Sequence, residues 1–293
     1  MSRSGSRWAI LRAGLLAGAL ALGRSAAAPA QAIRSADTAA LMTTVRVLAA
    51  DSMEGRRAGT PGGARARRYL LERLRALRLA PFGGRYEHPF TLRRDSTEAV
   101  NLFALVPGKR AGAPYIVLSA HYDHVGIRRG EIYNGADDNA SGTAAVLAIA
   151  ASLLRQPLQH PVIVALFDAE EAGLQGARAM LSDSALVRRD RIAFDVNLDM
   201  VSHSDSGVLW VAGSSYHSEL RPLLDSLAAA APVTLRIGHD RKGVGGEDDW
   251  SGSSDHGPFL AAGIPFLYFG VEDHKDYHKP TDDPETVTVA FFG

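Results

Sequence analysis

Apolar runs of strand length alternate with amphipathic or buried helical segments along most of the chain. From Tyr115 onward, strands are expected at residues 115–119, 161–167, 192–198, 208–211, 233–237 and 264–269. Helices are expected between them, at residues 141–154, 174–181, 217–230 and 258–262. Such alternation places parallel strands in one sheet and helices on both of its faces. The pattern therefore predicts an α/β fold with three αβα layers and a central mixed, mostly parallel twisted sheet.

The segment before this pattern is less regular. Helices are expected at residues 38–48 and 64–77, joined by the glycine-rich loop DSMEGRRAGTPGG at residues 51–63, and strands at residues 86–92 and 100–105. The second helix carries five arginines around an apolar stripe, which is typical of a solvated helix surface. No internal repeat or interdomain linker interrupts residues 33–293, so we expect a single domain there.

The first 32 residues have the pattern of a secretory signal peptide. Three arginines precede the apolar run from Ala13 to Leu22, and Ala30-Gln31-Ala32 offers a small-residue cleavage site. The apolar run is shorter than the roughly 20 residues that span a bilayer. We therefore expect a secreted or periplasmic bacterial protein with no stable membrane association after cleavage. An uncleaved membrane anchor is the alternative interpretation.

Charge and cysteine content exclude some classes of partner and of metal ligand. The whole chain has 32 basic and 32 acidic residues. Removing residues 1–32 removes four arginines and no acids, which leaves 28 basic and 32 acidic residues and a formal charge of −4. This balance argues against a nucleic-acid partner. Because the chain has no cysteine, disulfides and thiolate ligands are excluded, and any zinc must be held by histidines and carboxylates.

Metal-type side chains follow several of the predicted strands. In open α/β sheets, ligands bind beyond the carboxyl ends of the strands. Four separate segments are therefore expected to bring imidazoles and carboxylates to one sheet edge, beside a fifth that opens a helix. These segments are SAHYDHVG, NGADDNASG, FDAEEAGLQG, NLDMVS and DYHKPTDD. Two imidazoles and three carboxylates can hold two divalent ions if one carboxylate bridges them, which favours metal-assisted hydrolysis over simple binding.

The first two segments supply a histidine and a bridging acid. His121 and Asp123 lie on one side of an extended segment, so Asp123 can accept a hydrogen bond from the imidazole and fix its tautomer. Either Asp137 or Asp138 can bridge two ions from a tight turn before the helix at residue 141, and spacing alone leaves both open. The alternative for these aspartates is an N-cap role.

The next two segments supply further carboxylates. Glu170 and Glu171 diverge from an extended segment, so one can bind metal while the other takes a proton from a metal-activated water and returns it to the leaving group. Asp199 ends a buried-looking strand, and a buried carboxylate needs a partner such as a metal. Exposed acids and a structural aspartate are the respective alternatives.

The last ligand comes from a loop near the end of the chain. His278 is the first candidate, and its neighbour Tyr277 can donate a hydrogen bond to a developing oxyanion. His256 is the rival ligand, with Asp255 beside it as a residue that orients it or binds something itself. We assign no role to His124 or His274.

In this order and spacing the motifs resemble the co-catalytic, dinuclear zinc aminopeptidase family, which includes secreted bacterial leucyl aminopeptidases and the peptidase domain of glutamate carboxypeptidase. The resemblance runs from about Leu41 to Val287, and LAADSMEGRRAGTPGG looks like the family's N-terminal signature. It implies two zinc ions, with cobalt or manganese as possible substitutes. It also implies that the Asp138–Asn139 bond is cis and that Glu170 is the general acid/base. The implied metal ligands are His121, Asp138, Glu171, Asp199 and His278, with Asp138 shared, while Asp123, Asp255 and His256 lie behind them.

The expected activity is hydrolysis of the N-terminal peptide bond of peptides. Glutaminyl cyclase chemistry and carboxypeptidase-like amide chemistry use the same fold and are the alternatives within enzymes. A binding protein that has lost catalysis predicts missing ligands, whereas all of them are present. The chain departs from the family in two respects. It has no room for the protease-associated insert, and it stops soon after the last ligand, where members often carry a long helix.

Overall fold

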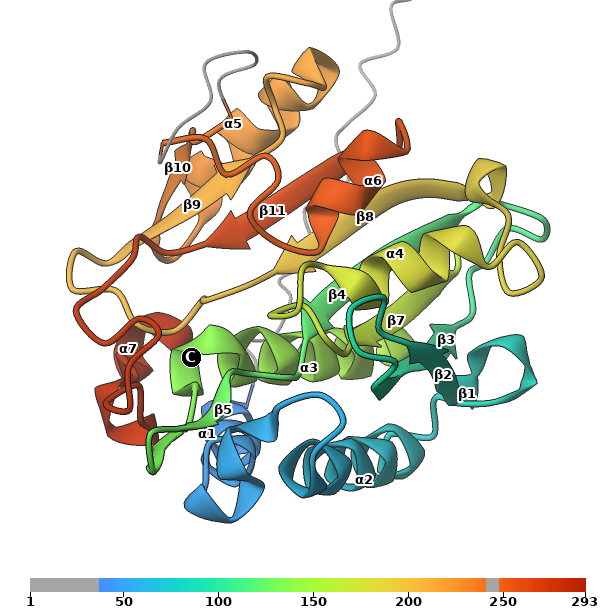
Figure 1. Ribbon diagram of the computed structural model, residues 1–293. Helices are drawn as coiled ribbons and strands as arrows, with labels where there is room; N and C mark the ends of the chain where they lie inside the picture. Colours follow the sequence, from blue (N-terminus) through green and yellow to red (C-terminus); the bar gives the residue numbers. More distant parts are fainter. Residues whose placement is uncertain (1–36, 241–247) are drawn as a thin grey trace, which may run out of the picture. The chain divides into compact units, whose positions relative to one another are not determined.

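The computed structural model describes residues 37–240 and 248–293. The expected signal peptide at residues 1–32 therefore lies outside the described residues. Within the described residues, one mixed sheet of nine strands runs in the order β1-β3-β7-β4-β8-β11-β9-β10, with β2 added beside β3. The predicted α/β class and mostly parallel central sheet are confirmed (Figure 1).

The central strands are parallel, and the strand next to them on each side runs in the opposite direction. β4 (Tyr115–His121) lies between β7 (Val162–Phe167) and β8 (Ile192–Leu198), and both pairings are parallel. β11 (Phe266–Gly270) pairs in parallel with β8 and antiparallel with β9 (Val208–Ala212). The outer strands are β1 (Ala80–Pro81), β2 (Glu87–Thr91), β3 (Glu98–Val106) and β10 (Thr234–Ile237).

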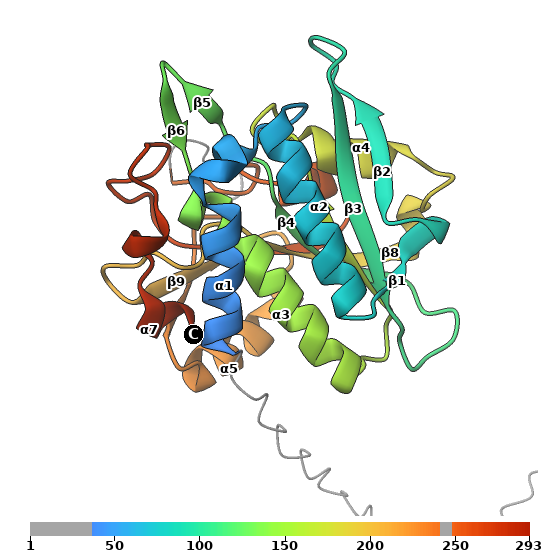
Figure 2. The same ribbon diagram turned by 90° about the horizontal axis from the view of Figure 1, so that it is seen from below.

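Helices cover both faces of this sheet. α1 (Thr38–Leu48), α2 (Pro61–Ala76) and α3 (Gly142–Arg155) lie on one face, as seen from below in Figure 2. α4 (Gln175–Ser182) and α6 (His256–Ala261) pack on the other face, where Met180 and Phe259 share a core with Phe103 and Phe167. The two remaining helices are α5 (Arg221–Ala230) and α7 (Val289–Phe292). Among the described residues, no helix is long and apolar enough to span a membrane.

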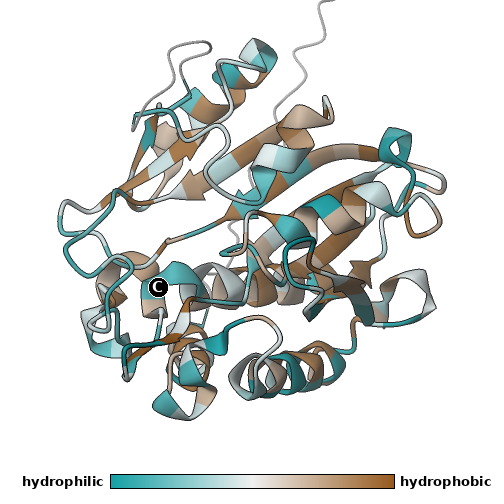
Figure 3. Cartoon of the chain, viewed as in Figure 1, coloured by the Kyte–Doolittle hydropathy of each residue, from teal (hydrophilic) through white to brown (hydrophobic). Residues whose placement is uncertain are grey.

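Local sequence explains most of the boundaries. α1 begins where Asp37 accepts hydrogen bonds from the amides of Ala39 and Ala40, a typical N-cap. α2 begins three residues before the predicted start, because Thr60 caps it and Pro61 suits its first turn. Every residue of β7 is buried, as expected for a central parallel strand, and Figure 3 shows this hydrophobic centre against the more hydrophilic α2.

The predicted elements omit a short antiparallel hairpin of β5 (Gly126–Arg128) and β6 (Glu131–Tyr133). Each strand has only three residues, too few to show an alternating pattern. The hairpin sits next to the 3₁₀ turn at Asp51–Arg56, and Gly55 is so close to Tyr133 and Gly126 that an added Cβ would lie 2.4 Å from the Tyr133 carbonyl oxygen. Glycine is therefore needed at position 55.

A fully buried arginine joins this N-terminal turn to the carboxyl edge of the sheet. Arg56 has 0% exposure and donates hydrogen bonds to the carbonyl oxygens of Leu48, Tyr122, Asn134 and Gly135. Burial lowers the pKa of Arg56 to about 10, although nearby carboxylates oppose that shift. Its hydrogen bonds hold the backbone just after His121, at Tyr122, and just before Asp138, at Asn134 and Gly135.

Replacing Arg56 with methionine should lower the free energy of unfolding by about 3 kcal/mol or more, because several buried carbonyl oxygens would lose their donor. Urea unfolding followed by circular dichroism measures this change. Arg68→Met, at an exposed position of α2, is the matched control and should change stability by no more than about 0.5 kcal/mol. Equal, small effects in the two variants would contradict the role given to Arg56.

Candidate metal centre

The predicted ligands meet at the carboxyl edge of the central strands. His121 ends β4, Asp199 follows β8, and Glu170 and Glu171 follow β7. All five predicted ligands line one cavity of about 300 Å³. Glu170 and Tyr277 line the same cavity, so every residue predicted to bind metal or to act on the substrate comes to one place.

The potential ligand atoms around this cavity form two neighbouring groups. His121, Glu170 and Asp199 make up the first group, and His124, Asp138, Glu171 and His278 the second; within each group the ligand atoms lie within 4.8 Å of one another. His121 Nε2 is 3.2 Å from Asp199 Oδ1. His278 Nε2 is 3.4 Å from Glu171 Oε1. Each group therefore offers nitrogen and oxygen donors at a spacing that suits a divalent ion.

Asp138 faces both groups, one with each oxygen. Its Oδ1 lies 3.4 Å from His121 Nε2, and its Oδ2 lies 3.0 Å from His278 Nε2. A carboxylate in this position can bridge two ions. Asp137, the alternative that spacing left open, points elsewhere: its Oδ1 accepts hydrogen bonds from the amides of Ser202 and His203.

The turn that carries Asp138 is held by polar contacts from distant segments. Asp282 accepts hydrogen bonds from the amides of Asp137 and Asp138, at 2.9 and 3.1 Å. The Asn139 side chain donates to the Leu198 carbonyl and accepts from Gly142 N. The Asp138–Asn139 peptide bond is cis, as the family resemblance implies. The turn is thus tied to the end of β8, which places Asp138 beside Asp199.

The Asp123 carboxylate was expected to accept a hydrogen bond from His121, but in the structure it has other partners. His121 Nδ1 faces the backbone oxygen of Asp123 at 3.2 Å, whereas the Asp123 carboxylate is 3.7 Å away. That carboxylate instead accepts hydrogen bonds from the amides of Glu170 and Glu171. One residue therefore joins two ligand-bearing segments, through its backbone to His121 and through its side chain to the glutamates.

His124 belongs to the centre, although sequence analysis assigned it no role. Its ring is fully buried, and Nδ1 lies 2.8 Å from Glu171 Oε1. Both atoms are buried, and their short contact brings a nitrogen and an oxygen donor together away from solvent, a pair that fits a cation. The HxxH spacing of His121 and His124 was the available signal. His274 lies further out, with Nε2 3.2 Å from Asp137 Oδ2 and its ring stacked on His203.

The remaining predicted residues lie around the cavity. The Tyr277 ring stacks on His278 with centroids 4.1 Å apart. Asp255 is fully buried, and neither of its carboxylate oxygens has a hydrogen-bond partner among the described residues. His256, the rival ligand, belongs to neither group: its Nε2 is 2.7 Å from the Trp250 carbonyl oxygen and its ring packs on Tyr268. Burial lowers the pKa of His256 to about 4.

Burial and neighbouring charges shift the pKa values of the ionisable side chains in the centre. Burial raises the pKa of Glu170 well above its ordinary value, with His121 opposing the shift. Burial alone would lower the pKa of His278, but Asp138 and Glu171 outweigh it and raise that pKa to about 10. In the metal-free protein, His278 therefore holds a proton that compensates the neighbouring carboxylates. These donors fit a pair of divalent cations, which would supply the same compensation.

Comparisons with known proteins agree with this geometry. A model of peptidase family M28 matches residues 101–291. The aminopeptidase YwaD of Bacillus subtilis is 30% identical over 195 residues, which cover 64% of this chain and 40% of that protein. The chain thus spans well under two thirds of the length of that relative.

Solved structures share the fold. BSAP, a zinc aminopeptidase from Bacillus subtilis, superposes with a TM-score of 0.69 at 18% identity, over 87% of this chain and 91% of that one. Glutaminyl cyclase from Porphyromonas gingivalis superposes with a TM-score of 0.71 at 20% identity, over 88% of this chain and 94% of that one.

Asp123→Ala should weaken zinc binding by about 10- to 100-fold, because the amides of Glu170 and Glu171 would lose their shared acceptor. Competition with a fluorescent chelator measures the affinity. Asp190→Ala, an exposed acid that forms a surface ion pair with Arg188, is the control. Unchanged zinc affinity in a folded Asp123→Ala protein would contradict this function of Asp123.

Zinc binding should release at least one proton at pH 8. The pKa of His278 is raised to about 10 in the metal-free protein, so its proton is present at pH 8 and must leave when the imidazole binds metal. Apparent zinc affinity should therefore rise as the pH increases toward 10. Calorimetry in buffers of different ionisation enthalpy counts the protons, and a release of zero would show that His278 is not a ligand.

Proposed function

Because the chain belongs to peptidase family M28, we propose that it is a dinuclear metallo-exopeptidase that removes residues from the free N-terminus of peptides. The observation that carries the proposal is Asp138, whose two oxygens face two separate donor groups. Zinc is the proposed metal, since histidine nitrogens and carboxylate oxygens are its usual ligands in catalytic sites without cysteine.

We propose His121, Asp138 and Asp199 as the residues that would hold one ion, and Asp138, Glu171 and His278 as those that would hold the other. His124 is an additional donor on the second side. Two bound ions would polarise the scissile carbonyl and lower the pKa of a water molecule. No further role is required of them.

The chain's own residues would carry out the proton transfers. Glu170 lies in the cavity wall beside the first donor group, and its raised pKa suits a group that must hold a proton and pass it on to the leaving group. It would take a proton from the attacking water and return it to the leaving amine. Tyr277, above His278, would donate a hydrogen bond to the oxygen of the tetrahedral intermediate.

Acidic groups near the cavity would select a free amino terminus. Glu170 lines the cavity, and the buried Asp255 interacts with it electrostatically. A protonated amine can compensate this negative charge, whereas an acetylated one cannot. This contrast supports aminopeptidase activity over endopeptidase activity. Glutaminyl cyclase chemistry remains the second candidate, because a solved enzyme of that class has the same fold.

The zinc-loaded protein should shorten peptides stepwise from a free N-terminus and leave their acetylated counterparts intact. Glu170→Gln should reduce the rate by about 100-fold or more, because the proton acceptor is lost while zinc binding is kept. Mass spectrometry of the products measures both effects. Glu219→Gln, at an exposed position of the 3₁₀ turn before α5, is the matched control.

The outcomes separate the candidates. Loss of ammonia from peptides with N-terminal glutamine, without chain shortening, would replace the exopeptidase proposal with cyclase activity. Intact peptides of every kind with a folded, two-zinc protein would contradict both candidates.

A further inference from the structure

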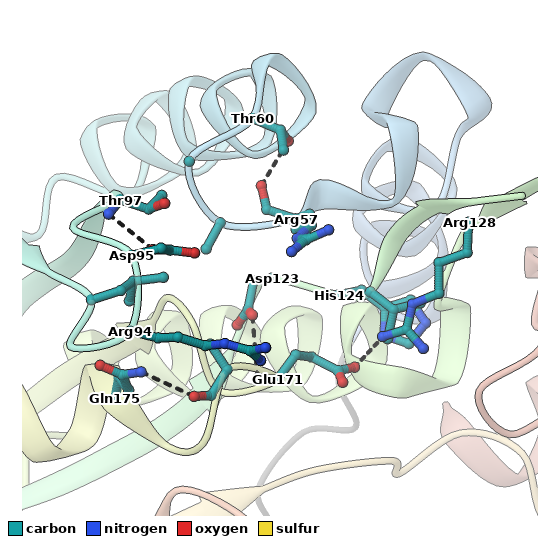
Figure 4. A pocket seen from close by; sticks show the side chains of 15 residues that line it. Arg57, Thr60, Arg94, Asp95, Thr97, Asp123, His124, Arg128, Glu171 and Gln175 are labelled. Atoms are coloured by element: carbon teal, nitrogen blue, oxygen red, sulfur yellow. Dashed lines mark hydrogen bonds and ion pairs between the residues drawn. The ribbon is translucent and has the colours of Figure 1, made fainter. Parts of the chain in front are cut away.

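A second, larger cavity adjoins the metal centre. It measures about 670 Å³, and Glu171 lines both it and the smaller cavity. Its floor includes Asp123 and His124, and its walls come from three separate segments: the loop before α2, the turn between β2 and β3, and the β5–β6 hairpin (Figure 4). Neither the ligand set nor the proton transfers described above use these walls.

Each wall carries one arginine. Arg57, Arg94 and Arg128 line the cavity, and all three are exposed. Within the part of the chain that the structure describes, none of them forms an ion pair with a carboxylate within 4 Å. The acids of the floor are already engaged, because Asp123 accepts backbone amides and Glu171 contacts His124. We call this space the arginine cavity.

Contacts of the aliphatic side-chain atoms and of the neighbouring backbone hold these three arginines at the cavity walls. The stem of Arg57 lies against Gly126, where an added Cβ would be 2.8 Å from Arg57 Cβ. The guanidinium of Arg128 lies 5.8 Å from the centre of the Tyr133 ring. The turn that carries Arg94 is fixed to the start of α4, since Arg93 N donates to Gln175 Oε1 at 3.0 Å.

Charge is therefore divided between the two cavities. The smaller cavity holds Glu170 and the carboxylates of the donor groups. The arginine cavity holds three exposed guanidinium groups and one exposed acid, Asp95, while its other two acids, Asp123 and Glu171, lie in the floor and are less exposed. Asp95 attracts Arg94 and Arg57 and offsets part of this positive charge. The remaining repulsion among the guanidinium groups would be relieved by an anion bound between them. Guanidinium groups bind carboxylates with paired hydrogen bonds.

We propose that the arginine cavity binds a carboxylate of the peptide substrate on the C-terminal side of the scissile bond. This proposal rests on the proposed exopeptidase function. A peptide whose amino terminus lies in the acidic cavity would pass Glu171 and bring its following residues into the arginine cavity. The site would favour short peptides with a free C-terminal carboxylate, or longer ones with aspartate or glutamate just after the cleaved bond.

The test compares substrates that differ only in this carboxylate. The zinc-loaded protein is given Leu-Ala-Ala as the free acid and as the C-terminal amide, and Leu-Glu-Ala against Leu-Gln-Ala, both as amides. Leucine p-nitroanilide, which has no following residue, reports the exopeptidase function separately. We expect kcat/KM to be about tenfold higher for the carboxylate-bearing peptide of each pair, mainly through a lower KM. A factor of this size is typical of hydrogen bonds to a charged group that remains partly solvated.

Substitutions then assign the preference to the cavity. The triple variant Arg57→Gln, Arg94→Gln, Arg128→Gln should bring the ratio between free acid and amide close to one, and each single variant should lower it partially. Arg68→Gln, at an exposed arginine outside the cavity, should keep the wild-type ratio. Raising the ionic strength should also reduce the ratio, because these contacts are partly solvated.

The results distinguish three failures. Turnover of leucine p-nitroanilide with equal rates for acid and amide peptides would overturn the carboxylate proposal and leave the exopeptidase function standing. No turnover of any substrate by the two-zinc protein would overturn the exopeptidase function itself. If inorganic phosphate raises the melting temperature through these arginines while acid and amide are cleaved alike, the cavity binds a free anion and the substrate proposal is wrong.

Discussion

The concentration of buried negative charge at the carboxyl edge of the sheet is the constraint on which the rest of the site depends. Asp123, Asp138 and Asp199 are buried at this edge, and Glu171 is nearly so; such charges are costly to bury unless they are compensated. The structure compensates them in part with Arg56, whose hydrogen bonds all go to backbone oxygens. The positive charge of Arg56 is therefore not paired with a single carboxylate and acts on several of them. Histidines that hold protons supply more in the metal-free protein, and two divalent ions would complete the balance.

The same contacts that manage this charge also set the geometry. Arg56 holds the backbone at Tyr122 and Gly135, Asp123 holds the amides of the two glutamates, and Asp282 holds the amides at the Asp138 turn. Each of these groups bonds to the backbone of a ligand-bearing segment, so the segments of His121, Asp138 and Glu171 are held by residues distant in sequence. Such outer contacts are what keep metal ligands oriented. Across Glu171, the arginines of the larger cavity give the site an acidic side and a basic side.

Sequence patterns predicted the framework and the positions of the donors well. The buried strands β4, β7 and β8 could be read from their apolar runs, and strand ends told which side chains would meet. Choosing Asp138 over Asp137 needed the family resemblance, because two adjacent acids in a turn have no spacing that separates them. Arg56 was not recognisable, since a sequence shows an arginine in a loop but not the four carbonyl oxygens that surround it. His124 was overlooked because its ring reaches the second donor group only through the fold of the chain beyond β4. The β5–β6 hairpin was too short for any periodicity, and its arginine was therefore not placed.

The central claim is that Asp138 joins two ions in one centre. X-ray absorption at the zinc edge, on protein loaded to saturation and with its zinc content measured by atomic emission, tests this claim most directly. The account predicts two zinc ions per chain, nitrogen and oxygen ligands only, and a metal–metal scattering contribution at about 3.5 Å. In Asp138→Ala that contribution should vanish. A single zinc per chain, or two zinc ions without metal–metal scattering in the unaltered protein, would contradict the account.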